Sequence, residues 1–165
     1  MPDQTFREWL GANQADVNRL SVAVKEFKSY ASRRVEELQQ NIQIPKRLAS
    51  AVGIKISVYS NGADDDSIYH CVEYIFAMPD GLNFALNATL YPNEWIIDVC
   101  TIADTPLASI QELFSQLRFD PYSQPGPDYF VIDKLDFDTD LPEIAARMQS
   151  VIDAIAAIVK TTRRR

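Results

Sequence analysis

Acidic side chains are the residues of this sequence with the clearest potential for chemistry. Glu73, Glu94 and Asp98 lie in stretches with strand-like alternation, and Asp80 lies in a turn between two such stretches. If these carboxylates converge on one face of a sheet, they can hold Mg²⁺ or act as general acid and base. Asp80 follows a proline, as in nucleases that use Pro-Asp and then an acidic-x-Lys strand, but no such triplet follows on the next strands. A metal-dependent hydrolase or nuclease is therefore an alternative interpretation, and the sequence assigns no metal site and no cofactor.

The thiols and the lone imidazole make a weak case for nucleophilic catalysis. His70 is the only side chain whose ordinary pKa lies near neutral pH. Cys71 follows it directly, and adjacent strand residues point to opposite faces of a sheet, whereas Cys100 can approach His70 across the sheet. We expect both cysteines to be buried, reduced thiols. Because the sequence also lacks G-x-S-x-G, P-loop and G-x-G-x-x-G motifs, we expect a protein that is not an enzyme and has no catalytic residues.

Exposed acids and aromatic residues point instead to a protein partner. Three consecutive aspartates follow Asn61-Gly62 in a predicted turn, two tyrosines lie in other turns, and a tryptophan begins a strand. An acidic rim around aromatic anchors suits a basic protein surface. The predicted partner-binding residues are Asp64, Asp65, Asp66, Tyr91, Trp95 and Tyr122.

The charge of the chain is unevenly distributed around a net value of -7. Residues 1–55 carry nine Lys/Arg against six Asp/Glu, residues 56–140 carry two against fifteen, and residues 141–165 carry five against two. The negative charge of residues 56–140 repels nucleic acid and anionic lipid, so we expect neither as a direct partner. It favours a partner protein with a basic surface, although negative charge also keeps small proteins dispersed.

A long helix is predicted at the N-terminal side of these residues. Apolar residues recur at spacings of three and four over residues 14–44, which predicts a helix about 40 Å long. Such a helix can exceed the span of one small domain, so part of its apolar stripe can meet another chain. A homodimer through this helix, and more generally a structural homo-oligomer, is a further interpretation.

The other elements are predicted to form an antiparallel sheet of about five strands. Strand-like alternation occurs over residues 54–59, 69–78, 82–90, 94–102 and 128–133. The connections between the second, third and fourth strands are short, which favours antiparallel neighbours. In the strand over 82–90, apolar residues are predicted to face inward and Asn83, Asn87 and Thr89 outward. A short helix at 106–117, capped by Asp104 or Thr105, and a C-terminal helix starting after Asp140 complete the order.

The predicted fold class is α+β, with helices and one sheet in two layers. We expect one domain over residues 1–165, with residues 160–165 as a solvated basic tail. No apolar run approaches the roughly 18 residues of a membrane span, and the first ten residues do not read as a signal peptide. The expected location is the cytoplasm.

The acidic character, the small size and the order helix, meander, helix, strand, helix resemble the type III secretion chaperone-like fold. The chain departs from that family, because four predicted strands rather than three precede the middle helix and one rather than two follows it. Proteins of the family are dimeric binders that hold a partner chain, so the resemblance implies a dimer and a protein-binding function. The leading interpretation is a non-enzymatic protein-binding module, and a chaperone, an immunity protein and an inhibitor all satisfy it.

Overall fold

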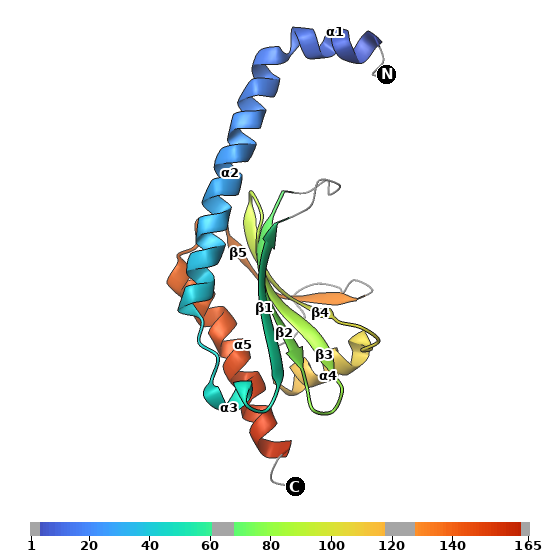
Figure 1. Ribbon diagram of the computed structural model, residues 1–165, viewed down its shortest axis with the longest axis vertical. Helices are drawn as coiled ribbons and strands as arrows, with labels where there is room; N and C mark the ends of the chain where they lie inside the picture. The colour runs from blue at the N-terminus through green and yellow to red at the C-terminus, as the bar shows by residue number, and fades with distance from the viewer. Residues whose placement is uncertain (1–3, 61–67, 118–127, 163–165) are drawn as a thin grey trace.

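The computed structural model describes the backbone of residues 4–60, 68–117 and 128–162, in which helices and one sheet alternate as shown in Figure 1. The helices are α1 (Gln4–Ala12), α2 (Gln14–Asn41), α3 (Lys46–Ala49), α4 (Leu107–Gln116) and α5 (Leu141–Thr162). The strands are β1 (Gly53–Ser60), β2 (His70–Ala77), β3 (Asn83–Leu90), β4 (Glu94–Thr101) and β5 (Tyr129–Asp136). This is the predicted α+β class, and the five strands, α2, α4 and α5 follow one another in the predicted order.

The strands form one antiparallel sheet in which neighbours in sequence are neighbours in space, in the order β1-β2-β3-β4-β5. β2 and β3 are joined by a tight turn at Gly81, whose φ of 90° glycine adopts at little cost. Between Ile97 and Asp98 the pairing of β4 with β5 shifts, because β5 carries one extra residue there. Such a bulge bends a strand and increases its twist. The meander predicted from the short connections is therefore confirmed.

One face of the sheet, here called the inner face, packs against the helices. α2 and α5 lie along this face, as Figure 1 shows. α4 closes one end of it, where Phe114 contacts Phe84 and Phe130 at ring-centroid distances of 5.6 and 5.4 Å. The buried inner-face residues of β2, β3 and the turn between them are His70, Val72, Tyr74, Phe76, Met78, Phe84, Leu86, Ala88 and Leu90. The inward direction predicted for these alternating residues is confirmed.

α2 is longer than the sheet that it covers. Its 28 residues span about 42 Å, whereas each eight-residue strand spans about 27 Å. Ala31, Val35 and Leu38 in its C-terminal half are fully buried, but Leu20 and Val22 in its N-terminal half are 66% and 55% exposed. Figure 1 shows this N-terminal half, together with α1, extending beyond the sheet.

The structure differs from the sequence-based expectations at two helix ends. α2 ends at Asn41 rather than at residue 44, and the short helix α3, which the sequence did not predict, follows it. α4 begins at Leu107 with Pro106 in the N-cap position and no side-chain cap. The hydroxyl of Thr105, predicted as a possible cap, accepts a hydrogen bond from the backbone N–H of Asn83 at 3.0 Å. Thr105 therefore joins the start of α4 to β3 instead of capping the helix.

Candidate functional site

The other face of the sheet, here called the outer face, carries polar residues that are nevertheless buried. Register places Glu73 of β2, Asn87 of β3 and Asp98 of β4 side by side in one row. None of the described helices lies on this face (Figure 1). Even so, Asn87 and Thr89 are only 4% and 5% exposed. Alternation in the sequence predicted their outward direction correctly but not their burial.

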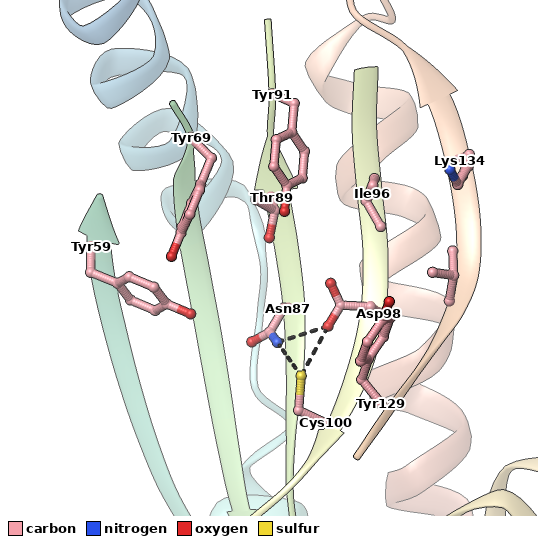
Figure 2. A pocket seen from close by; sticks show the side chains of 11 residues that line it. Tyr59, Tyr69, Asn87, Thr89, Tyr91, Ile96, Asp98, Cys100, Tyr129 and Lys134 are labelled. Atoms are coloured by element: carbon pink, nitrogen blue, oxygen red, sulfur yellow. Dashed lines mark hydrogen bonds between the residues drawn. The ribbon is translucent and has the colours of Figure 1, made fainter. Parts of the chain in front are cut away.

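A pocket with a volume of about 480 Å³ opens on the outer face (Figure 2). Its size lies in the range typical of sites for small ligands or single large side chains. The described residues that line it are Tyr59, Tyr69, Asn87, Thr89, Tyr91, Ile96, Asp98, Cys100, Tyr129, Val131 and Lys134. The lining thus combines four tyrosines with a small polar floor.

Tyr59, Tyr69 and Tyr91 form a continuous aromatic wall of the pocket. The rings of Tyr59 and Tyr69 are nearly perpendicular with centroids 6.4 Å apart, and those of Tyr69 and Tyr91 are 5.6 Å apart. Tyr129 stands on β5, on the other side of Asp98 (Figure 2). Burial raises the pKa of Tyr91 to about 12 and also raises the pKa of Tyr59. At neutral pH these two phenols are therefore uncharged donors that also present aromatic surface.

Asn87, Asp98 and Cys100 form a hydrogen-bonded group on the pocket floor. The amide nitrogen of Asn87 donates to Oδ1 of Asp98 at 2.9 Å and to Sγ of Cys100 at 3.2 Å. The thiol of Cys100 donates to the same Oδ1 of Asp98 at 3.3 Å. Within the described part of the chain, the buried Oδ1 of Asn87 has no hydrogen-bond partner. Both donors are therefore directed to one oxygen of one carboxylate.

The environment of this group shifts its protonation equilibria. Burial raises the pKa of Asp98, the charge of Glu73 raises it further, and the hydrogen bonds from Asn87 and Cys100 act in the opposite direction. Burial also raises the pKa of Cys100, and it raises the pKa of Cys71 to about 12. Both thiols are consequently protonated at neutral pH and react poorly as nucleophiles. The described pocket residues supply no activated nucleophile.

Lys134 is the one cation among the described lining residues. Its Nζ lies 3.6 Å from Oε2 of Glu94, in a pair whose side chains are 37% and 29% exposed. Register places Lys134 opposite Ile96 of β4, one row away from Asp98. The pocket therefore has an acidic floor, and the basic side chain at its edge already has an acidic partner.

Of the four carboxylates considered for metal chemistry, Glu73, Glu94 and Asp98 share the outer face but do not all meet. Asp80 lies in the turn between β2 and β3 and lines a separate pocket beside Met78 and Leu113. Glu73 and Asp98 flank one residue of β3 in the same row. Glu94 lies four residues from Asp98 along β4, roughly 13 Å away, and pairs with Lys134. In residues 4–60, 68–117 and 128–162, no group of three or more His, Cys, Asp and Glu could hold a metal ion.

His70 lies on the inner face, away from the pocket. Burial, and then the charge of Lys28, lower its pKa. Cys100 points to the outer face, so the approach of Cys100 to His70 that the sequence left open does not occur. Cys71 points to the face opposite His70, as predicted, and both cysteines are free.

The residues predicted to bind a partner are distributed differently. Tyr91 lines the pocket. Trp95 is 0% exposed on the inner face, so its assignment as a surface anchor is wrong. The remaining four predicted positions, Asp64, Asp65, Asp66 and Tyr122, lie outside the described residues. The pocket residues that the sequence did not single out as a site include Tyr59, Tyr69 and Tyr129. The sequence feature that these three tyrosines share is a position at or beside the end of a predicted strand.

Comparison with known proteins does not assign a family or a function to the chain. No protein-family model, no curated protein and no solved structure matches the chain. In the described part of the chain, none of the helices is long and apolar enough to cross a membrane.

Proposed function

We propose that this chain is a non-enzymatic binding module that holds a basic partner protein against the outer face of its sheet. The observation that carries the proposal is a hollowed sheet face that none of the described helices covers, on which a half-buried carboxylate lies among four tyrosines. Tyrosines in such a pocket supply large contact area at low conformational cost, which is typical of the anchoring positions of protein interfaces.

Charge supports the same assignment. Residues 56–140 provide all five strands except the start of β1, and they carry fifteen Asp/Glu against two Lys/Arg. On the outer face itself, Glu73 and Asp98 lie next to the pocket, and Glu94 neutralises Lys134. A basic surface is therefore attracted to this face, whereas an acidic surface is repelled.

The proposed role covers a chaperone, an immunity protein or an inhibitor, which differ in what they bind. It agrees with the resemblance to type III secretion chaperone-like proteins, whose family function is to hold a partner chain. Both cysteines are free thiols, which suits the reducing cytoplasm as the proposed location.

Reversing one outer-face charge should weaken capture of the partner. Glu73→Lys places a cation in the row of Asp98, so we expect a basic partner to be retained about two- to tenfold less from lysate of the native host. Wild-type capture should also fall at high salt, because screening weakens attraction between exposed charges. Quantitative mass spectrometry of the retained proteins is the measurement.

Glu112→Lys is the matched control for this experiment. It makes the same charge change on an exposed position of α4, which packs on the inner face. Equal loss of capture in the two variants would show that net charge alone matters and would remove the outer face from the proposal. Absence of any salt-sensitive basic partner would contradict the proposal as a whole.

A second proposal, self-association through α2, is favoured by the exposed N-terminal half of that helix. The apolar stripe of α2 continues through Val17, Leu20 and Val24, beyond the part that its own sheet covers. Residues 14–30 carry three Lys/Arg against two Asp/Glu, in contrast to the net -7 of the whole chain. Two copies can therefore approach each other here without strong repulsion, and each would cover the stripe of the other.

Leu20→Glu should convert such a dimer into a monomer. The substitution places a charge at the centre of the exposed stripe, and we expect the dimer dissociation constant to rise about tenfold or more. Sedimentation equilibrium over a range of concentrations measures it. Ala15→Glu adds the same charge at an exposed residue on the opposite side of the helix, and it should leave the dissociation constant nearly unchanged. A monomeric wild-type protein at all concentrations would exclude this association.

A further inference from the structure

We propose that the outer-face pocket is a binding site for a guanidinium group, such as the side chain of an arginine. The inference rests on the proposed function, since it names the group of a basic partner that the pocket receives. The observation behind it is that both hydrogen-bond donors of the pocket floor bind the same oxygen of Asp98, and the other oxygen receives neither.

The floor offers acceptors that the protein itself leaves open. Oδ1 of Asp98 receives the hydrogen bonds of both Asn87 and Cys100. Figure 2 shows the other carboxylate oxygen turned away from these two donors, which are the described side chains that hydrogen-bond to Asp98. Oδ1 of Asn87, in a side chain that is 4% exposed, also has no partner among the described residues, but it is enclosed, so a ligand donor reaches it after a shift of the Asn87 side chain. A buried acceptor without a donor is costly, so the site favours a ligand rich in donors.

Guanidinium has the chemistry that such a floor lacks. It carries five N–H donors in a rigid plane and no acceptor, and its geometry matches carboxylate oxygens. It is also less strongly hydrated than an ammonium group, so a partly buried pocket removes less favourable hydration from it. A neutral ligand with as many acceptors as donors fits this floor less well than guanidinium, because its own acceptors would find few donors there.

The tyrosine wall suits the flat faces of the same group. Tyr59, Tyr69 and Tyr91 stand in contact with one another on one side of the floor, and Tyr129 stands on the other side (Figure 2). Cations placed over tyrosine rings are attracted by the negative face of the ring, and guanidinium stacks on such rings as well. The wall and the floor therefore select the same chemical class.

The electrostatic surroundings agree with a cation rather than an anion. Asp98 is faced by Glu73 and the uncharged Cys71 from β2, by the uncharged Cys100 on its own strand, and by the uncharged Tyr91 beside β3. Lys134 on β5 is paired with an acid at the pocket edge. An anion would meet two carboxylates, whereas a cation would stabilise the ionised form of Asp98, which burial disfavours. Affinity for the cation should therefore rise as the pH rises through the pKa of Asp98.

The test compares two probes that differ in charge but not in shape. N-acetyl-arginine amide carries the guanidinium, and N-acetyl-citrulline amide carries a neutral urea of nearly the same outline. Titration of the isotope-labelled full chain by NMR should show saturable shifts at the pocket residues with the arginine probe. The citrulline probe should bind about tenfold more weakly or not at all. A Gly-Arg-Gly peptide should bind at least as well as the free probe if the group arrives on a partner chain, and less well if the site is shaped for a free metabolite.

Asp98→Asn removes the charge and keeps the shape of the floor. The asparagine oxygen can accept the hydrogen bonds that Asn87 and Cys100 now donate, so the variant should fold and should lose the arginine probe by about tenfold. Glu112→Gln, on exposed α4, removes a charge elsewhere and should leave probe affinity unchanged. Equal binding of the two probes, or full retention of the arginine probe by Asp98→Asn, would overturn the inference. If capture of a basic partner still depends on Glu73 in that case, the proposed function stands and only the guanidinium assignment is lost.

Discussion

Replacing Trp95 by alanine should lower the free energy of unfolding by about 3–5 kcal/mol, the usual cost of deleting a large aromatic side chain from a core. Trp95 is 0% exposed, and register places it between Leu90 of β3 and Leu135 of β5. Removal of its ring leaves a cavity in the core between the sheet and the helices, and neighbouring side chains fill such a cavity only partly. Since domains are typically stable by about 5–15 kcal/mol, this is a large share of the total.

The other tryptophan provides the control. Trp9 on α1 is 53% exposed, and Trp9→Ala should change the free energy of unfolding by less than about 1 kcal/mol. Urea unfolding followed by far-UV circular dichroism measures both variants without depending on tryptophan fluorescence. If Trp95→Ala proved as mild as Trp9→Ala, Trp95 would be a surface residue in solution, and its original assignment to a partner interface would be restored.

Asp98→Asn should raise the free energy of unfolding at pH 7 by about 1–3 kcal/mol, which is the range for desolvating a polar group in a protein. The pKa of Asp98 is raised in the folded chain above its ordinary value of 3.8, chiefly by burial. Above the folded pKa the ionised group therefore destabilises the folded state relative to the unfolded state. Asparagine keeps the hydrogen bonds on the floor but carries no charge that must be desolvated.

The difference in the free energy of unfolding between Asp98→Asn and the wild type should depend on pH. As the pH falls through the folded pKa towards 3.8, Asp98 becomes neutral in the folded chain, so its cost disappears and the wild type should approach the stability of Asp98→Asn. Chemical denaturation of both proteins between pH 4 and pH 8, roughly the span in which such carboxylates titrate, measures the difference. Asp16→Asn, which removes a charge from an exposed pair with Arg19, is the control and should leave the free energy of unfolding at pH 7 nearly unchanged. An Asp98→Asn variant that is less stable than the wild type at pH 7 would show that the carboxylate is well paired, contrary to the pocket described above.

If Asp98→Asn stabilises the chain, the carboxylate lowers stability in the wild type, and such a costly residue in a pocket points to a binding role. Groups with shifted pKa values in concave sites are frequently retained for binding or catalysis in spite of their cost. Asp98 combines that cost with an open oxygen directed into the pocket. The two predictions thus separate Trp95, whose removal should destabilise the fold, from Asp98, whose neutralisation should stabilise it.

The sequence by itself determined the sheet and its inner face. The apolar alternation of β2 and β3, from His70 to Leu90, predicted which side chains enter the core, because a strand half-buried against helices must alternate with period two. The connections at Gly81 and at Tyr91-Pro92-Asn93 are only a few residues long. They predicted antiparallel neighbours, because a parallel neighbour requires a long crossover connection. The apolar spacing of α2 predicted a helix too long for its own domain, and the exposed Leu20 agrees with that length.

Only the tertiary structure decided the outer face. Asn87 and Thr89 have the polar pattern of solvent-facing strand residues, and no local signal shows that they are buried. Their burial and the pocket depend on register across several strands, which brings together Tyr59 of β1, Tyr91 beside β3 and Tyr129 of β5 from positions far apart in the sequence. Trp95 is a different case, because the alternation of its own strand, with Glu94 and Asp98 outward, already places Trp95 inward, and its assignment as a surface anchor overlooked that pattern. Periodicity is a property of each strand alone, whereas a pocket is a property of how the strands are paired, and for that reason the sequence predicted the sheet but not the site.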